Sequence, residues 1–222
     1  MHSRIRTFVK YFDRVYCIHY PSAERREAIE KQFNTVGIGD VKYVYADQPK
    51  GKFHMSNMRR NPNREFAVNL SHLKAVVHAI DDGADRPVFF EDDIVFRKDA
   101  NALLDSAIKS LPPDWSVLYM GGHPCETVES VGENLVKVGR FSFAESYSIR
   151  GPALRPFVDY WLNRIGQVHA MYDRILGEFA QYNGGYCVYP VLTEQPPGYS
   201  HISRGMDDKR ELVRRGWANN LG

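Results

Sequence analysis

Residues 87–96, Pro-Val-Phe-Phe-Glu-Asp-Asp-Ile-Val-Phe, place three consecutive acids between apolar and aromatic residues. An apolar run of this length is typical of a buried β-strand. Ionised carboxylates do not remain in an apolar core without partners, because removing one from water costs several kcal/mol or more. The segment therefore predicts a strand that delivers its acids to a cleft.

The three acids are expected to divide between two directions. Side chains alternate along an extended chain, so Glu91 and Asp93 would share one side and Asp92 would face the other. Two carboxylates on one side, with coordination positions left for phosphate oxygens, suit Mg²⁺ or Mn²⁺. The alternative is an acidic strand end that caps the helix predicted to begin near Asp99. The apolar residues on both sides of the acids favour the metal interpretation.

Composition excludes several classes of protein. The chain has 222 residues, of which 43% are hydrophobic and 25% charged, so disordered and membrane proteins are disfavoured. The net charge of +2 gives no global field for nucleic acid. Three widely spaced cysteines favour a reducing compartment. With no apolar run of the roughly 20 residues that span a bilayer and no signal-peptide core, we expect a cytoplasmic protein, or one peripheral to the inner membrane face.

Strands and helices alternate along the chain. Apolar patterns predict strands at residues 15–20, 41–45, 87–96, 115–120, 135–144, 146–149 and 187–192, and helices at 23–36, 65–80, 99–111, 151–165 and 173–179. The first strand, loop and helix open a Rossmann-like unit, in which ligands bind beyond the carboxyl ends of the strands. Arg25 and Arg26 lie there, within reach of a diphosphate, although a solvated basic pair explains either one equally well. Asp47 follows the second strand, where it would meet a base or ribose.

Several of these segments, in order from about residue 15 to about residue 203, resemble glycosyltransferase family 25. This family includes bacterial lipooligosaccharide galactosyltransferases and collagen galactosyltransferases. The most specific matches are the helix at residues 64–75, with its Ser71-His72-Leu73, and the acidic motif at residues 90–94. Weaker matches are Ile18-His19-Tyr20 with Glu24-Arg25-Arg26-Glu27, Ser146-Tyr147-Ser148-Ile149 with Gly151 and Ala153, Asp173 at a helix start, and residues 190–195 with Ser200 and Ile202.

Two positions depart from the family pattern. His19-Tyr20-Pro21 stands where Asn-Leu-Asp is more usual, and this affects the nucleotide contacts. His201 stands where an aspartate is common. Histidine is also a ligand for Mn²⁺, so the resemblance still implies a metal role for this position. A surface loop residue is the other interpretation of His201.

The resemblance implies one α/β domain of the GT-A type, a Rossmann-like mixed sheet flanked by helices. Its nucleotide-binding half would cover about residues 12–98 and its acceptor half about residues 99–205, followed by a charged tail at 206–222. The implied metal ligands are Glu91, Asp93 and His201. The implied donor-binding residues are Ile18, His19, Tyr20, Arg25, Arg26, Asp47, Ser71, Lys74, Glu91 and Asp92.

The implied reaction is the inverting transfer of a hexose, galactose or glucose, from a UDP-sugar to an acceptor hydroxyl. The default acceptor is a lipooligosaccharide glycan. Mn²⁺ or Mg²⁺ would neutralise the departing diphosphate. Asp173 is the candidate base that takes the proton of the acceptor hydroxyl.

The sequence is also compatible with other functions. The acceptor could instead be a protein or a modified DNA base; Arg59, Arg60, Arg64 and the basic residues at 209–215 would form a nucleic-acid footprint, although such clusters are usually only solvated. A sugar nucleotidyltransferase also brings carboxylates to a sheet edge, but no glycine-rich phosphate loop follows the first strand here. A non-catalytic sugar-binding module with the same fold is the third alternative.

Overall fold

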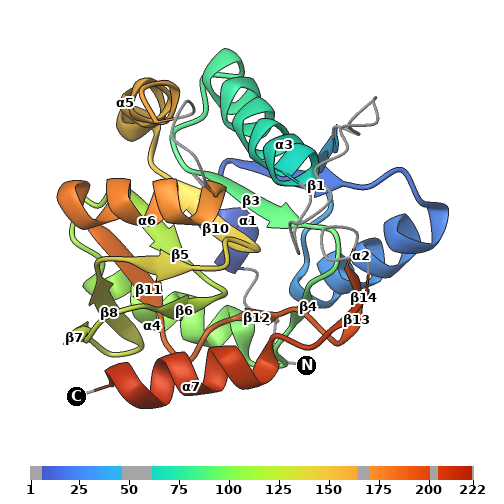
Figure 1. Ribbon diagram of the computed structural model, residues 1–222. Helices are drawn as coiled ribbons and strands as arrows, with labels where there is room; N and C mark the ends of the chain where they lie inside the picture. Colours follow the sequence, from blue (N-terminus) through green and yellow to red (C-terminus); the bar gives the residue numbers. More distant parts are fainter. Residues whose placement is uncertain (1–6, 47–61, 165–170, 201–204, 222) are drawn as a thin grey trace.

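The computed structural model describes residues 7–46, 62–164, 171–200 and 205–221. Its centre is an eight-stranded mixed sheet with the order β2-β1-β3-β10-β5-β11-β8-β7 (Figure 1). These strands are β1 (Arg14–His19), β2 (Lys42–Tyr45), β3 (Pro87–Glu91), β5 (Val117–Tyr119), β7 (Glu129–Gly132), β8 (Leu135–Val138), β10 (Ser146–Ile149) and β11 (Gly185–Val188). β1 pairs in parallel with β2 and β3, and β5 pairs in parallel with β11, whereas the other neighbours are antiparallel.

Helices cover both faces of this sheet. On one face lie α3 (Pro62–Asp81), α5 (Gly151–Leu162) and α6 (Tyr172–Asn183). On the other lie α1 (Thr7–Tyr11), α2 (Ala23–Val36) and α4 (Ala100–Ser110). The expected α/β class, a mixed sheet flanked by helices, is confirmed. The sheet contains strands from both predicted halves of the chain.

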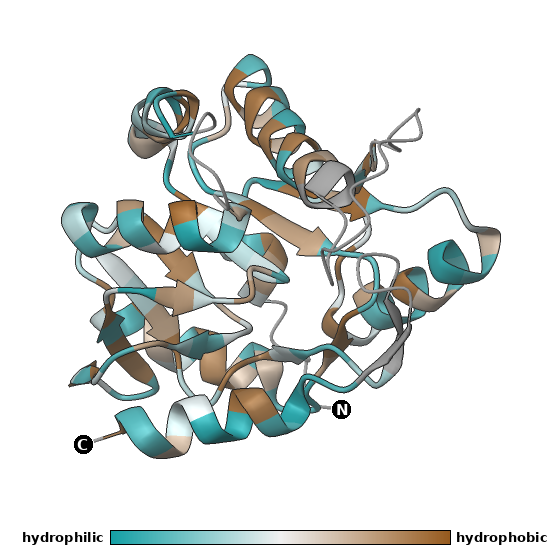
Figure 2. Ribbon diagram, viewed as in Figure 1, coloured by the Kyte–Doolittle hydropathy of each residue, from teal (hydrophilic) through white to brown (hydrophobic). Residues whose placement is uncertain are grey.

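Alternation along the strands builds two cores. In β3, Phe89 packs in the core beneath α3, α5 and α6, whereas Val88 and Phe90 pack in the core beneath α2 and α4. Burying a side chain of this size contributes about 1.5–3 kcal/mol. Figure 2 shows hydrophobic residues along the strands and on the helix sides that face them, with hydrophilic residues outside.

The acidic segment differs from its prediction in one respect. Residues 87–96 do not form one strand: β3 ends at Glu91, Asp92 and Asp93 lie in a turn, and β4 (Val95–Phe96) resumes afterwards. β4 pairs with β12 (Thr193–Glu194) outside the main sheet. The turn is consistent with the charge of the two aspartates, because a central strand would bury them without partners.

Residues 206–222 were expected to be a charged tail, but most of them form α7 (Arg210–Asn220). The helix packs against β6 (His123–Pro124), which pairs with β9 (Phe141–Ser142). Trp217 is buried, and its indole nitrogen donates to the Gly122 carbonyl oxygen at 2.9 Å. Trp217 and Val213, which lies one turn earlier and packs against the same core, thus hold a helix whose other residues are mostly charged or polar.

The short strands β13 (Gly198–Ser200) and β14 (Gly205–Asp207) form a hairpin before α7. Within the described residues, no helix is both long enough and apolar enough to span a bilayer.

Candidate functional site

Three parallel strands bring the predicted donor residues to one edge of the sheet. Ile18 in β1 is in register with Val44 in β2 and with Glu91 in β3. The next residue, His19, is buried and faces Tyr45 at the end of β2. The carboxyl ends of the three strands therefore coincide, as in Rossmann-like sheets that bind ligands there.

Asp92 turns toward the loop between β1 and α2. Its side chain is 5% exposed and accepts hydrogen bonds from the Tyr20 backbone nitrogen at 2.7 Å and an Arg25 nitrogen at 2.6 Å. The His19 Nδ1 atom lies 3.0 Å from the same carboxylate. Ser22 caps α2 by accepting from the Arg25 backbone nitrogen. Asp92 thus fixes the loop and the orientation of Arg25.

Glu91 and Asp93 turn the other way, as the alternation predicted. The Gln195 amide nitrogen lies 2.5 Å from Glu91 Oε2 and 2.8 Å from Asp93 Oδ1. The two carboxylates therefore converge on one point. A second Arg25 nitrogen lies 3.5 Å from Asp93 Oδ2, so this guanidinium contacts both aspartates.

Gln195 reaches this point through the pairing of β4 with β12. The register places Glu194 opposite Val95 and Thr193 opposite Phe96. Because the two strands are antiparallel, the residue after Glu194 approaches the end of the acidic turn. Gln195 and Asp93 are 102 residues apart in the chain. No local pattern could have identified Gln195, although it lies in a segment that resembles family 25.

The two carboxylates differ in their affinity for protons. Burial would raise the pKa of Glu91, but its hydrogen bond with His72, the charge of Lys209 and the Gln195 amide together lower it. Partial burial and the adjacent Glu91 charge raise the pKa of Asp93 to about 6. At neutral pH, Glu91 is thus the better-stabilised anion of the pair.

Three hydrogen-bonded side chains, those of His72, Tyr147 and Tyr172, extend from Glu91 into the core. His72 Nε2 lies 3.2 Å from Glu91 Oε1, and His72 Nδ1 lies 3.1 Å from the Tyr147 hydroxyl, which in turn lies 2.8 Å from the Tyr172 hydroxyl. A carboxylate only accepts, so Nε2 carries the proton, and in a neutral imidazole Nδ1 accepts from Tyr147. His72 is buried and positions Glu91.

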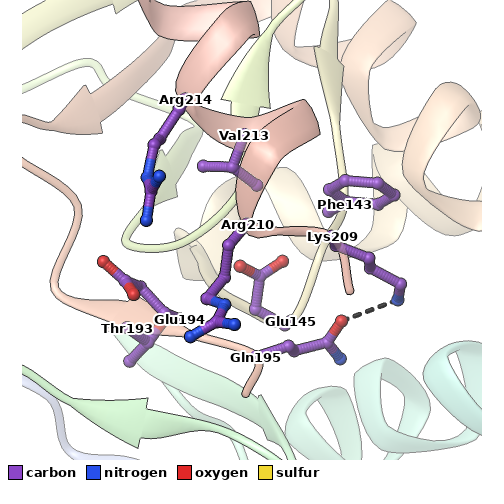
Figure 3. A pocket seen from close by; sticks show the side chains of 9 residues that line it. All are labelled: Phe143, Glu145, Thr193, Glu194, Gln195, Lys209, Arg210, Val213 and Arg214. Carbon is purple, nitrogen blue, oxygen red and sulfur yellow. Dashed lines mark hydrogen bonds between the residues drawn. The ribbon is translucent and has the colours of Figure 1, made fainter. Parts of the chain in front are cut away.

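An open pocket lies between the β9–β10 loop, β12 and α7, and Gln195 is the lining residue that also contacts the carboxylate pair (Figure 3). Lys209 lies at one side of it, beside Phe143, and donates to Gln195 Oε1 at 2.6 Å. The ammonium also lies 4.9 Å from the centre of the Phe143 ring. The pocket wall therefore carries a positive charge next to the two acids.

Glu145 lines the same pocket and was not among the predicted site residues. It is 4% exposed, and its Oε2 has no hydrogen-bond partner among the described residues. Its backbone oxygen accepts from the Glu91 backbone nitrogen at 2.8 Å. A Cβ at Gly121 would lie 2.6 Å from Glu145 Oε1 and 2.5 Å from the Thr193 hydroxyl, so this close approach requires glycine.

Glu145 predicts a pH dependence of stability. Burial raises the pKa of Glu145 from 4.5 to about 8, and the nearby charges of Glu91 and Asp93 act in the same direction. The charge of Lys209 opposes them. The native chain then binds more protons than the unfolded chain over this window, so the unfolding free energy falls as the pH rises from 4.5 to 8. We expect Glu145→Gln to remove a loss of roughly 4 kcal/mol across that window. Denaturant unfolding at about pH 5 and about pH 8.5 measures the difference; equal pH dependence in both proteins would contradict it.

The structure separates the two predicted arginines. Arg25 contacts the acids, as described above. Arg26 instead pairs with Glu30 at 2.5 Å and lies 3.0 Å from the centre of the Tyr43 ring in β2. The structure thus brings Arg25, and not Arg26, to the acidic turn.

The predicted residues on α3 have different surroundings. Ser71 is buried and its hydroxyl donates to the Ala67 carbonyl oxygen at 2.6 Å, a common helix contact. Lys74 is half-buried on the same helix. His72, on the same helix, contacts Glu91 directly, with 3.2 Å between its Nε2 and Glu91 Oε1.

Asp173 opens α6, as expected, and supports the β9–β10 loop. Its Oδ2 accepts from the Phe143 backbone nitrogen at 3.1 Å and from the Ser142 hydroxyl at 3.3 Å. Phe143 has a φ of 65°, a conformation that side chains other than glycine rarely adopt. Asp173 therefore stabilises the loop whose Phe143 ring contacts the Lys209 ammonium. Within the described residues, none of its hydrogen bonds joins it to Glu91 or Asp93.

Two of the three predicted metal ligands, Glu91 and Asp93, lie within the described residues. Asp47 and His201 lie outside the described residues. Within those residues, no cluster of three or more His, Cys, Asp and Glu side chains is arranged to hold a metal ion. Glu91 and Asp93 nevertheless converge on the point marked by the Gln195 amide nitrogen. Carboxylate and amide oxygens are ligands for Mg²⁺ and Mn²⁺, so these residues fit the predicted cation.

Comparisons with known proteins show only distant similarity. Neither a protein-family model nor a curated protein sequence matches this chain. A similar solved structure is a glycosyltransferase involved in the glycosylation of the major capsid of PBCV-1, with a TM-score of 0.44 and 10% identity over 76% of this chain and 73% of that chain.

Two further solved structures are similar at the same level. Mannose-1-phosphate geranyltransferase from Thermus thermophilus has a TM-score of 0.44 and 10% identity over 82% of this chain and 75% of that chain. A197 from STIV has a TM-score of 0.43 and 11% identity over 88% of this chain and 95% of that chain. Similarities this low indicate neither an activity nor a substrate for this chain.

Proposed function

We propose that this protein is a glycosyltransferase that uses a divalent cation and moves a hexose from a UDP-sugar to an acceptor hydroxyl. The observation that carries the proposal is the convergence of Glu91 and Asp93 beside the carboxyl ends of three parallel strands. Nucleotides bind at this edge in Rossmann-like sheets. The resemblance to family 25 supplies the UDP-sugar and the inverting course of the proposal.

Each residue at the edge has a distinct task in this proposal. Glu91 and Asp93 would hold Mn²⁺ or Mg²⁺, which when bound supplies Lewis-acid neutralisation of the leaving diphosphate. Arg25, oriented by Asp92, presents a second positive charge to the phosphate oxygens. His72 keeps the Glu91 carboxylate ionised and correctly turned.

The donor can be identified without knowledge of the acceptor. The purified protein is incubated with Mn²⁺ and a panel of UDP-sugars, and UDP release is followed over time. We expect slow hydrolysis of one UDP-hexose, galactose or glucose, because water replaces the missing acceptor. Release of pyrophosphate from UTP and a sugar phosphate would instead indicate a nucleotidyltransferase. Sugar binding without turnover would indicate a non-catalytic module.

Asp173 is the proposed base, and its substitution distinguishes two roles. If Asp173 accepts the acceptor proton, Asp173→Asn should lower transfer by about a hundredfold or more while UDP binding stays intact. If it only anchors the β9–β10 loop, the amide retains an oxygen for the Phe143 nitrogen, and transfer should remain close to normal. Asp159→Asn, on α5, is the matched control. Steady-state transfer rates and UDP titrations provide both readouts.

A glycan hydroxyl, as in a lipooligosaccharide, remains the proposed acceptor. The cations around α7 contact groups of the chain itself: Arg210 donates to Asp208 at 2.7 Å, and Arg215 donates to Glu211 at 2.9 Å. Both pairs are exposed, and Arg59 and Arg60 lie outside the described residues. A DNA acceptor would instead give strongly salt-dependent binding.

A further inference from the structure

We infer that Gln195 is a third ligand of the proposed cation, through its side-chain oxygen, and that Lys209 competes for that oxygen. The inference rests on the proposed function, because it concerns the same cation. It assigns to two residues near the end of the chain a role in cation binding and in the response of the site to its substrate.

The Gln195 amide nitrogen lies where a cation bound by both carboxylates would have to lie. One atom, Gln195 Nε2, lies within hydrogen-bond distance of an oxygen of Glu91 and an oxygen of Asp93. A cation held by both carboxylates must approach this same point, because their oxygens converge nowhere else in the described contacts. Binding therefore requires the amide nitrogen to leave, since a donor hydrogen and a cation repel each other.

Rotation of the Gln195 amide can bring its oxygen to the carboxylates in place of its nitrogen. Its oxygen and its nitrogen have nearly the same size and lie on opposite sides of one rotatable bond. A half-turn of the Gln195 amide exchanges them and presents Oε1, a ligand suited to Mg²⁺ or Mn²⁺, to the position of the carboxylates. The β4–β12 pairing holds the backbone next to Gln195, so no backbone movement is needed.

Lys209 is affected by the same rotation. Its ammonium now donates to Gln195 Oε1 at 2.6 Å. After the half-turn it would face the amide NH₂, and two donors cannot bond to each other. Lys209 would thus leave Gln195 and remain over the Phe143 ring, free to contact the phosphates of a nucleotide. Cation binding and phosphate binding are coupled in this way.

The test measures Mn²⁺ binding directly, without turnover. Mn²⁺ is titrated into the nucleotide-free protein and followed by calorimetry and by the electron paramagnetic resonance signal of free Mn²⁺. The proteins compared are the wild type, Gln195→Ala, Gln195→Met, Lys209→Met and, as a matched control on an exposed acid of β7 that does not line the pocket, Glu129→Gln. Thermal unfolding of each variant confirms that it is folded.

We expect Gln195→Ala and Gln195→Met each to weaken Mn²⁺ binding by about tenfold, because a ligand is lost. We expect Lys209→Met to tighten Mn²⁺ binding, since a competitor is removed, and to weaken UDP binding by about tenfold. Glu129→Gln should change neither. Methionine has nearly the volume of glutamine, so it separates loss of the ligand from loss of packing.

Mn²⁺ binding that stays the same or becomes tighter in both Gln195 variants would overturn the inference, because an amide that only occupies the site competes with the cation. That result would leave the proposed function standing if the wild type still binds Mn²⁺ and releases UDP. A wild type that shows no saturable Mn²⁺ binding would overturn the inference together with the cation dependence of the proposed function.

Discussion

Replacing Asp93 by asparagine is expected to lower UDP-sugar hydrolysis and transfer by about a thousandfold, because one of two carboxylate ligands is lost. The effect on folding should be small. The Asp93 side chain is 38% exposed and lies in a turn, so the unfolding free energy should change by less than about 1 kcal/mol. UDP release with saturating Mn²⁺ measures the first effect, and urea unfolding measures the second.

Glu129→Gln is the matched control for this prediction, because it removes an exposed acid of β7 that neither lines the pocket nor contacts the carboxylate pair in the described contacts. It should leave UDP release within about twofold of the wild type, as most surface substitutions do. Nearly normal turnover in Asp93→Asn would contradict the assignment of Asp93 to the cation.

The adjacent acid should behave in the opposite way. Asp92→Asn is expected to lower the unfolding free energy by about 3 kcal/mol, because a buried charge-assisted network loses its central anion. Asp92 accepts from Tyr20 and Arg25 and lies beside His19, and an amide nitrogen at this place would face one of these donors. Urea unfolding of the wild type and the variant gives the difference directly.

Asp93→Asn serves as the comparison for Asp92→Asn, since the same chemical change is made one residue away. Equal stability of the two variants would show that burial and hydrogen bonding of Asp92 do not stabilise the loop. Transfer should also fall in Asp92→Asn, because Arg25 loses the partner that orients it, but UDP binding should fall with it.

The opposite orientations of Asp92 and of the pair Glu91 and Asp93 could be predicted because they depend on local geometry. Alternation along an extended chain sends neighbouring side chains in opposite directions, and the apolar residues before Glu91 place the acids at a strand end. The prediction held although Asp92 and Asp93 form a turn. The same alternation assigns Phe89 and Phe90 to opposite cores.

The partners of these acids could not be predicted, because they come from distant parts of the chain. Gln195 meets Asp93 only through the β4–β12 pairing, and Lys209 meets Gln195 only because Trp217 holds α7 in place. Neither contact has a local signal. Glu145 could not be predicted either, because its burial depends on the close approach of Gly121. Gly121 follows β5, and Glu145 precedes β10, which pairs with β5.

Charge did not indicate the helix at the end of the chain. The tail was predicted only to be charged, and α7 forms there and lines the pocket while Arg210, Arg214 and Arg215 are exposed. The two arginines of α2 looked equivalent in sequence, and only the structure shows that Arg25 faces the acids and Arg26 faces Tyr43. Helix position separates them, because adjacent residues on a helix point about a quarter-turn apart or more.

The central claim is that Glu91 and Asp93 bind a cation shared with the diphosphate of a nucleotide. Calorimetric titration of UDP into the wild type, with and without Mn²⁺, tests it most directly, because linkage requires each ligand to strengthen the other. We predict at least about tenfold tighter UDP binding with Mn²⁺, and loss of this gain in Asp93→Asn. UDP binding of equal strength with and without Mn²⁺ would contradict the claim.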